Sequence, residues 1–194
     1  MPKTDPAREA LLTALEASGV SIPLWDGILI EETVRVAPGA TILPGCILRG
    51  NTTIAAGSVI GPGSVLTDAV IGKNCTVKNT YITESTLEEN VSIGPFSQVR
   101  PGCHIAAGCK IGDFVEVKNS HIGQKTAIAH LTYVGDTDCG SGVNFGCGVA
   151  IANFNGKEKF RTTIGDNAFL GCNTNLVAPV TIGAGAYPAA GATV

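Results

Sequence analysis

Residues 36–65 read VAPGAT ILPGCI LRGNTT IAAGSV IGPGSV, and this stretch decides the fold because each block of six repeats one pattern. An aliphatic residue opens each block, a small residue or turn former often follows it, and a small or hydroxyl residue lies near the fifth position. The same phase returns at Leu87 (LEENVS IGPFSQ VRPGCH IAAGCK IGDFVE) and at Ile164 (IGDNAF LGCNTN LVAPVT IGAGAY). A short fixed period of this kind is typical of an all-β parallel β-helix, in which each unit is one short strand plus a corner.

Blocks of six residues form a coil because side chains on a strand alternate between its two faces. The opening aliphatic residue and the small residue near position five can therefore both point inward, while glycine, proline and asparagine supply the corners. Stacked coils then bury aliphatic residues above one another. Some steps are five residues long, among them those from Leu66 to Ile71 and from Val117 to Ile122, and we expect a tighter corner at each.

One stretch, residues 150–163, interrupts the repeat. The blocks cover residues 36–149 and 164–194, which at three blocks per coil gives roughly eight coils. Between them lies AIANFNGKEKFRTT, which is polar and charged and has no six-residue phase. In a repeat protein such an insertion forms an extended loop on one face of the coil, often the face that binds a ligand. A tolerated surface excursion explains the stretch equally well, so both interpretations stand.

The composition is that of a soluble protein with one main domain and a short flank. The chain has 194 residues, of which 15% are charged, and a formal net charge of −3. That charge gives no general attraction to nucleic acid, no basic run indicates a membrane surface, and no apolar stretch approaches the length of a membrane span. The start, MPKTDPAREA, lacks the features of a secretory signal. We therefore expect a cytoplasmic protein that binds neither nucleic acid nor membranes.

The seven cysteines are an odd number and lack metal-binding CxxC spacing. Four of them fall in the small-residue slot, four residues after the aliphatic residue that opens their block: Cys46, Cys75, Cys103 and Cys109. Alanine or serine would serve equally well there. We interpret these cysteines as small buried hydrophobic residues in a reducing compartment, and we expect no disulfide framework.

Residues 1–20 differ from the repeats and predict a short amphipathic α-helix. Asp5 can cap the helix, Pro6 suits its first position, and Gly19 can end it. Three leucines share one side at helical spacing: Leu11, Leu12 and Leu15. A helix of this length is not stable alone, so we expect it to pack on the coil or on a partner. The β-helix would then occupy residues 21–194.

Three histidines are candidates for chemistry. His104 and His121 fall among corner and surface positions, where solvated side chains are the ordinary case. The spacing of the three lacks the close histidine pair that a zinc site requires, so we expect no metal within one chain. His130 stands in AIAHLTYVGD, where the repeat would accept a small polar residue. Either a packed, hydrogen-bonded histidine or a general base would explain it, because imidazole exchanges protons near neutral pH.

Cations are sparse in the coil, and three of them stand out: Arg100 in FSQVRPG, Lys118 in FVEVKNS and Lys159 in GKEKFRT. Arg100 and Lys118 are separated by one coil at six-residue spacing, so we expect them to lie directly above each other. Stacked cations repel unless an anion lies between them. A solvated face with counter-ions is one interpretation. A phosphate cradle is the other, for which the fork of arginine is well suited.

Six stretches carry, in order, a likeness to a known family: IGPFSQVRPG, GDFVEVKNS, AHLTYVGD, GVNFGCG, NFNGKEKFRTTIGD and LVAPVTIGAGA. Through them the chain resembles the acetyltransferase half of the GlmU family. Its members are bifunctional N-acetylglucosamine-1-phosphate uridyltransferases and glucosamine-1-phosphate N-acetyltransferases. The likeness includes the unphased loop, so it is more specific than the repeat that many acyltransferases share. LEASGVSI near the start is similar to the end of the family's interdomain helix.

The resemblance implies a left-handed β-helix that assembles as a homotrimer with active sites between subunits. The reaction would move an acetyl group from acetyl-CoA to the amine of glucosamine 1-phosphate, for UDP-N-acetylglucosamine and peptidoglycan synthesis. By position, His130 would be the general base. The substrate would be held by Arg100, Lys118 and Lys159 at its phosphate and by Tyr133, Asn144 and Asn153 at its sugar. The acetyl-CoA groove would run along Cys147, Phe154, Cys172 and Ala190. No metal is implied for the acetyl transfer.

The chain departs from the family at three of these positions: Cys172 replaces a serine, Cys147 an alanine and Phe154 a tyrosine. It also stops at Val194 inside the repeat and has no counterpart of the family's nucleotidyltransferase domain, so we expect a fragment that makes no UDP-sugar. Two alternatives stand beside acetylation of glucosamine 1-phosphate. One is acylation of another amino sugar, which the three cations disfavour. The other is a non-catalytic trimeric scaffold for a separate nucleotidyltransferase, which the missing tail favours.

Overall fold

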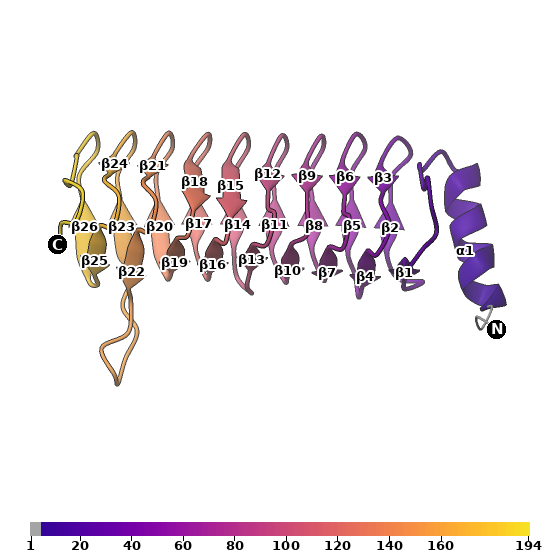
Figure 1. Ribbon diagram of the computed structural model, residues 1–194, viewed down its shortest axis with the longest axis horizontal. Helices are drawn as coiled ribbons and strands as arrows, with labels where there is room; N and C mark the ends of the chain where they lie inside the picture. Colours follow the sequence, from indigo (N-terminus) through magenta and orange to yellow (C-terminus); the bar gives the residue numbers. More distant parts are fainter. Residues whose placement is uncertain (1–4) are drawn as a thin grey trace.

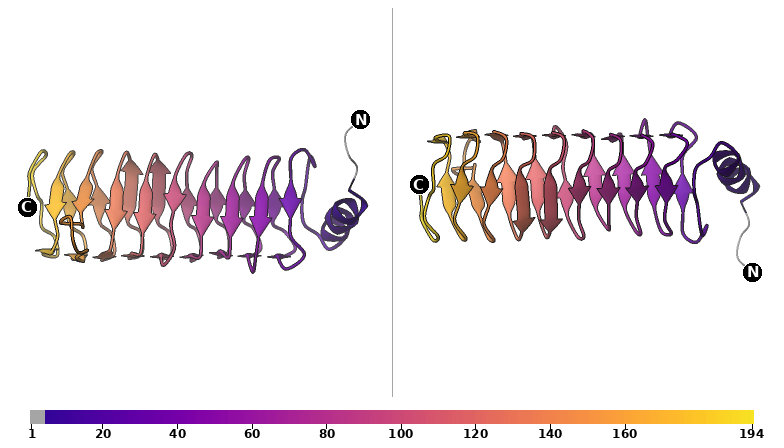
Figure 2. Two further views of the ribbon diagram at one scale, coloured as in Figure 1. Left: turned by 90° about the horizontal axis from the view of Figure 1, so that it is seen from below. Right: turned by 90° about the horizontal axis from the view of Figure 1, so that it is seen from above.

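The computed structural model describes residues 5–194 as one short helix followed by a parallel β-helix (Figure 1). The chain winds through three strands per turn, and equivalent strands of successive turns pair in parallel to form three sheets. The turns stack in a row, with the helix at one end and the C-terminus at the other (Figure 2). The β-helix predicted from the six-residue repeat is confirmed.

The three sheets are named sheet 1, sheet 2 and sheet 3. Sheet 1 comprises β1 (Leu29–Ile30), β4 (Ile47–Arg49), β7 (Val65–Thr67), β10 (Tyr81–Thr83), β13 (Gln98–Val99), β16 (Glu116–Lys118), β19 (Tyr133–Gly135), β22 (Ala150–Ala152) and β25 (Asn175–Val177). Sheet 2 comprises β2 (Arg35–Val36), β5 (Thr53–Ile54), β8 (Val70–Ile71), β11 (Thr86–Leu87), β14 (His104–Ile105), β17 (His121–Ile122), β20 (Thr137–Cys139), β23 (Thr162–Ile164) and β26 (Val180–Ile182). Sheet 3 comprises β3 (Thr41–Ile42), β6 (Val59–Ile60), β9 (Thr76–Val77), β12 (Ser92–Ile93), β15 (Lys110–Asp113), β18 (Ala127–His130), β21 (Asn144–Phe145) and β24 (Phe169–Leu170).

The coil has about nine turns rather than the eight predicted, because it starts before Val36. Sheet 1 and sheet 2 each contain 9 strands. Strand β1 already pairs with β4 through the register Leu29–Ile47. The sequence pattern missed this first turn because Glu31 and Glu32 stand where later turns carry small corner residues.

The core is a column of side chains contributed by every strand. The residue that opens each block is buried in all turns from Ile42 to Ile182. Its neighbours along the strand are partly or fully exposed, except for the buried Gly135 of β19, and this is the alternation expected of a pleated strand. Burial of one aliphatic side chain contributes about 1.5–3 kcal/mol, so the column supplies the main stabilisation of a coil whose strands are very short.

The small-residue slot links one turn to the next by hydrogen bonds. Ser58 Oγ donates to the carbonyl oxygen of Gly72 at 2.7 Å and accepts the N–H of Cys75 at 3.0 Å. The thiols of Cys75 and Cys109 lie in the same slot, 2.9 and 3.1 Å from carbonyl oxygens of the next turn. All four cysteines predicted there are buried, and burial raises the pKa of each thiol. Their interpretation as small buried residues is confirmed, and all seven cysteines are free.

The five-residue steps from Leu66 to Ile71 and from Val117 to Ile122 have the tight corners expected from the sequence. Asp68 in the first and Asn119 in the second have φ angles of +50° and +44°. Aspartate and asparagine tolerate this left-handed conformation because their short polar side chains hydrogen-bond locally. The corner of Asn119 lies beside the loop discussed below.

Helix α1 (Pro6–Ala17) begins and packs as predicted. The side chain of Asp5 accepts the N–H groups of Ala7 and Arg8 at 3.1 and 3.3 Å. Leu12 is fully buried against the coil, and Arg8 Nε donates to the carbonyl oxygen of Ile28 at 2.8 Å. The helix therefore lies across the end of the coil (Figure 2). Residues 1–4 of the predicted N-terminal segment lie outside the described residues. No helix within residues 5–194 combines the length and apolar character that a membrane crossing requires.

We predict that Gly112→Ala destabilises the coil next to Asp113. A Cβ atom at Gly112 would collide with the backbone carbonyl of Ala129 in the adjacent strand β18. Forcing the two strands apart should cost about 1–3 kcal/mol, as overpacking of a close-packed interior does. Chemical denaturation followed by circular dichroism measures the loss. Gly183→Ala is the matched control, since a Cβ atom there meets nothing within 4 Å; equal effects of both substitutions would contradict the prediction.

Candidate functional site

Arg100 and Lys118 lie on successive turns at the corner between sheet 1 and sheet 2. The register pairs Val99 with Val117, which places Arg100 directly over Lys118 as the sequence spacing predicts. Arg100 Nη1 donates to Glu116 Oε1 at 2.8 Å, so its guanidinium is balanced by one carboxylate. Both side chains of this ion pair are partly exposed.

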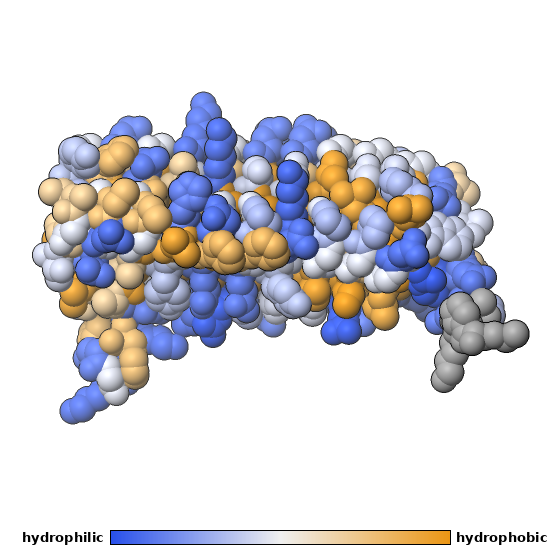
Figure 3. All heavy atoms as spheres, in the orientation of Figure 1, coloured by the Kyte–Doolittle hydropathy of each residue, from blue (hydrophilic) through white to orange (hydrophobic). Residues whose placement is uncertain are grey.

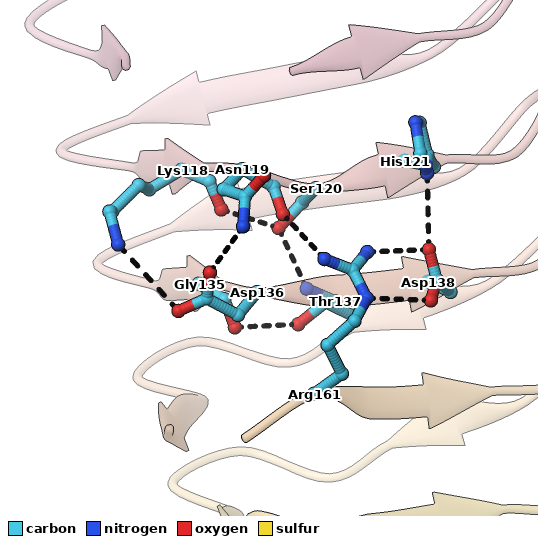
Figure 4. Close-up of polar contacts among 9 residues, drawn as sticks. All are labelled: Lys118, Asn119, Ser120, His121, Gly135, Asp136, Thr137, Asp138 and Arg161. Atoms are coloured by element: carbon cyan, nitrogen blue, oxygen red, sulfur yellow. Dashed lines mark hydrogen bonds and ion pairs between the residues drawn. The ribbon is translucent and has the colours of Figure 1, made fainter. Parts of the chain in front are cut away.

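Asp136 is the buried carboxylate beneath this corner. Its Oδ2 lies 3.6 Å from Lys118 Nζ, and its Oδ1 accepts a hydrogen bond from Asn119 Nδ2 at 2.5 Å (Figure 4). Its Oδ2 also accepts a hydrogen bond from the side-chain amide of Asn153. Burial acts to raise the pKa of Asp136, but the hydrogen bonds from the two asparagines and the charges of Lys118 and Lys159 outweigh it. The pKa consequently lies below its ordinary value. Asp136 is therefore ionised at neutral pH.

Lys159 belongs to the loop and lies at the same corner as Lys118 and Asp136. Strands β22 and β23 take the ends of the predicted loop 150–163, so that residues 153–161 leave the coil and project from it between these strands (Figure 1). Lys159 is bridged to Phe154, the neighbour of Asn153, and Asn153 contacts the same Asp136 carboxylate as Lys118 does. The interaction with the neighbouring Lys118 also lowers the pKa of Lys159. Arg100, Lys118 and Lys159 face the carboxylates of Glu116 and Asp136, which leaves one net positive charge on the cluster.

Tyr133 and Asn153 complete this group. Tyr133 opens strand β19, and its ring crosses Gly135, where a Cβ atom would collide with the phenol. The same Cβ atom would lie 2.9 Å from Asn153 Nδ2. Gly135 is paired with Lys118 in register. The absence of a side chain at Gly135 thus lets Tyr133, Asn153 and Lys118 converge on one surface.

His130 lies at the corner between sheet 3 and sheet 1, just before Tyr133. It ends strand β18, in register with Asp113, and its Nδ1 lies 2.7 Å from Asp113 Oδ1. The hydrogen bond with the imidazole lowers the pKa of Asp113. The side chain of His130 is 57% exposed, so the packed histidine considered from the sequence is wrong. Among the described residues Nδ1 is the ring nitrogen with a partner, which leaves Nε2 available to accept a proton.

His104 and His121 lie on the outer face of sheet 2 rather than at corners. Their rings are neighbours on adjacent turns, with centroids 6.4 Å apart. Each is also paired with a carboxylate, His104 with Glu88 at 2.8 Å and His121 with Asp138 at 3.1 Å. The expectation that the histidines lack a close pair is therefore wrong for these two. Even so, no group of three or more histidine, cysteine or acidic side chains in residues 5–194 is arranged to hold a metal ion.

The structure brings together three of the four residues that the resemblance assigns to a groove. The N–H of Asn173 donates to Cys147 O and the N–H of Gly191 to Cys172 O, both at 2.8 Å, so these cysteines occupy one corner column on successive turns. Ala190 stacks on the glycine that precedes Cys172. Cys172 is exposed and Cys147 half-buried. This column extends from the corner of His130 toward the C-terminal end of the coil, since the N–H of Gly148 donates to the carbonyl oxygen of His130.

Phe154 and Asn144 lie elsewhere. Phe154 is in the loop and 56% exposed. Asn144 is on sheet 3, paired in register with Ala127 and Phe169. Neither side chain shares a sheet or corner with the residues it was expected to accompany, so one subunit does not assemble the complete set.

Sequence reasoning missed the carboxylates that organise the site: Asp113, Glu116 and Asp136. A signal existed, because Asp113 precedes His130 by one turn and Asp136 follows Asn119 by one turn. That signal was hidden by turns of unequal length, since a single five-residue step shifts which residues stack.

The sequence is similar to one family model and to several curated proteins. The family model described as bacterial transferase hexapeptide (six repeats) matches residues 84–119. The bifunctional protein GlmU of Brevibacillus brevis is 45% identical over 187 residues, which cover 96% of this chain and 41% of that protein. GlmU of Clostridium acetobutylicum is 47% identical over 169 residues, or 87% of this chain and 37% of that protein. The chain thus spans about two fifths of the length of the curated relatives that it matches.

Among solved structures, LpxA from Acinetobacter baumannii is similar with a TM-score of 0.49 and 14% identity, over 87% of this chain and 65% of that one. The match to the hexapeptide-repeat model and the three-sheet coil together confirm the all-β parallel β-helix of hexapeptide repeats expected from the sequence.

We predict that Asp136→Asn lowers the free energy of unfolding at neutral pH by about 1–3 kcal/mol, because the new amide N–H₂ faces donors instead of acceptors. The folded-state pKa of Asp136 lies below the unfolded value of about 3.9. Its stabilising contribution is thus present above the unfolded pKa and lost as pH falls through the folded pKa. The difference between variant and wild type should shrink as urea unfolding is repeated from neutral pH down to about pH 3. A difference independent of pH would contradict the ionised, buried carboxylate.

Proposed function

We propose that this chain, a hexapeptide-repeat β-helix similar to part of GlmU, transfers an acetyl group from acetyl-CoA to the amine of glucosamine 1-phosphate. The observation that carries the proposal is the arrangement around strand β19. An oriented histidine lies at the corner before the strand, and a cluster of three cations lies at the corner after it. At about 3.3 Å per residue, three residues span roughly 10 Å, a distance that side chains from both corners can close around a monosaccharide.

His130 is assigned the role of general base. An ammonium group cannot attack a thioester, so the amine must lose a proton to Nε2 as its new C–N bond forms. Asp113 accepts a hydrogen bond from Nδ1–H and thereby stabilises the imidazolium. The C–S bond then breaks, and the departing thiolate of CoA takes the proton back from the imidazolium. A base positioned in this way accelerates such a reaction by about 10²–10⁴-fold.

The cation cluster is assigned to the phosphate of the acceptor. Lys118 and Lys159 lie side by side and Arg100 stacks above Lys118, so a dianionic phosphate would relieve their mutual repulsion. Tyr133 and Asn153, between the cluster and His130, are assigned to the sugar. Fixing the phosphate orients the amine toward the thioester, which is catalysis by positioning. The same cations favour a phosphorylated acceptor over an unphosphorylated amino sugar.

Acetyl-CoA is assigned to the column of Cys147, Cys172 and Ala190, which begins at the corner of His130. Asn144 and Phe154 lie away from the groups they would complete. Their expected contacts with sugar and acetyl-CoA therefore require a neighbouring subunit. A homotrimer in which each site spans two or more subunits satisfies this requirement, and we propose that assembly in the cytoplasm, where acetyl-CoA and the sugar phosphate are expected to be present.

We predict that His130→Ala lowers kcat by about 10²–10⁴-fold while the variant folds and assembles as the wild type does. The assay incubates the chain with acetyl-CoA and glucosamine 1-phosphate and follows release of the free CoA thiol, with glucosamine as the control acceptor. Asp113→Asn should lower kcat to a smaller extent, because it misorients the base without removing it. Wild-type release that does not need the phosphate, or an unimpaired His130→Ala variant, would contradict the proposal. No release by the wild type would favour the scaffold.

We predict that alkylation of Cys172 with N-ethylmaleimide abolishes acetyl transfer and that acetyl-CoA protects against it. Cys172 is the exposed cysteine, whereas five others are buried, so mass spectrometry should find the adduct first at this residue. Cys172→Ser, which restores the family's usual residue, should resist inactivation. Full activity after stoichiometric modification of Cys172 would remove this residue from the acetyl-CoA groove.

A further inference from the structure

The loop of residues 153–161 is a hairpin with its own internal bonds. Phe154 and Lys159 form an antiparallel bridge, and the N–H of Phe160 donates to the carbonyl oxygen of Asn153 at 2.8 Å. At the tip, Asn155 Oδ1 accepts the N–H groups of Lys157 and Glu158 at 2.9 and 2.8 Å. These bonds fix the shape of the hairpin. They do not fix its direction relative to the coil, which depends on the two points where it leaves and rejoins.

The first of these points is held by Asn153. Its side-chain amide donates to Asp136 Oδ2, while the other oxygen of this carboxylate accepts Asn119 Nδ2. Asn153 and Asp136 are both buried. The end at which the hairpin leaves the coil is thus bonded to the preceding turn.

The second point is held by Arg161, as Figure 4 shows. Its Nε and Nη2 donate to Asp138 Oδ2 and Oδ1 at 2.8 and 2.5 Å, and its Nη1 donates to the carbonyl oxygen of Asn119 at 3.2 Å. A bidentate pair of this kind is shorter and more directional than a single ion pair. The hydrogen bond with Arg161 is also the main reason that the pKa of Asp138 falls to about 2.

Both attachments converge on Asn119. Its side chain reaches Asp136, which binds Asn153, and its carbonyl oxygen accepts Arg161. Residues from three successive turns are therefore linked under the base of the hairpin, and no attachment involves Lys159, the residue that the hairpin presents beside Lys118. An exposed ion pair alone contributes little to global stability. The consequence of this network is local: it sets where the hairpin points.

We propose that Arg161 is a positioning residue: by clamping the returning end of the hairpin to Asp138 and Asn119, it holds Lys159 beside Lys118 without touching the substrate itself. This rests on the proposed function, in which Lys118 and Lys159 hold one phosphate. Arginine is required because a lysine ammonium can pair with Asp138 but cannot present two parallel N–H groups to it and a third to the carbonyl of Asn119.

The test is Arg161→Ala in the full chain, with two readouts. Amide hydrogen exchange over residues 154–160 should become severalfold faster, while exchange in the coil and the thermal midpoint stay as in the wild type. The KM for glucosamine 1-phosphate should rise about tenfold or more, because small misplacements of positioning groups are costly. The KM for acetyl-CoA should rise less, because Phe154 follows Asn153, whose bond to Asp136 the substitution leaves in place. Arg161→Lys should give an intermediate effect in both readouts. Asp138→Asn should resemble Arg161→Ala, and the double variant should be no worse than either, since both remove one interaction.

Arg49→Ala is the matched control. Like Arg161, Arg49 is an exposed arginine that pairs with a carboxylate, here Glu31 at 3.9 Å, but it ends strand β4, many turns from the hairpin. It should leave both readouts unchanged. Unchanged exchange in Arg161→Ala would overturn the clamp, and faster exchange with an unchanged KM would overturn the positioning role. If the wild-type chain releases no CoA thiol, the proposed reaction fails by itself. Calorimetric binding of glucosamine 1-phosphate then replaces KM, and an Arg161→Ala affinity equal to that of the wild type would overturn the positioning role.

Discussion

The parallel register between turns is the constraint on which the rest of this structure depends. It places each residue beside the equivalent residue of the next turn, so that Val99 is paired with Val117 and Asp113 with His130. Strands of two to four residues cannot hold such a register alone, so the turns depend on one another through stacked side chains. What stacks inside is apolar and small. Outside, the stacked groups include exposed aromatic rings, such as Phe96 and Phe114 with centroids 5.6 Å apart, and the surface drawn in Figure 3 mixes hydrophobic with hydrophilic residues. They also include columns of like or complementary polar groups, and the candidate site is assembled from such columns at two neighbouring corners.

Stacking also creates an electrostatic difficulty at these corners. Arg100 over Lys118, with Lys159 alongside, would be mutually repulsive. Asp136 offsets part of this repulsion from below, and it stays ionised because hydrogen bonds from Asn119 and other donors outweigh its burial. These hydrogen bonds offset the cost of desolvating the carboxylate. The ionised Asp136 therefore holds the cations in place before any anion binds. Donors and charges fixed in advance need no reorganisation when a ligand arrives, which is the condition for efficient positioning.

The sequence predicts those parts of the fold and of the site that follow the six-residue repeat. It does not predict the parts where the length of the repeat changes or a loop intervenes. The six-residue period is sufficient for the coil, for the buried cysteine slot and for the stacking of Arg100 on Lys118. It is insufficient for His130, because a five-residue step intervenes and shifts the face on which the histidine lies. The pairing of His104 with His121 was missed for the same reason. Contacts of Arg161 with Asn119 join residues 42 positions apart across a loop, and no short-range pattern encodes them.

On a coil of this kind, three cations can surround a single phosphate only if one of them comes from a loop. Neighbouring strands lie about 4.8 Å apart, so three cations in one column would extend over roughly 10 Å. A single phosphate could then contact two of them well but not the third. Inserting residues 153–161 lets Lys159 approach from the side of the column and lie next to Lys118. The residues of the hairpin do not pair with neighbouring turns, so the strand register does not fix their position. Side-chain hydrogen bonds of Asn153 and Arg161 fix it instead at the base of the hairpin.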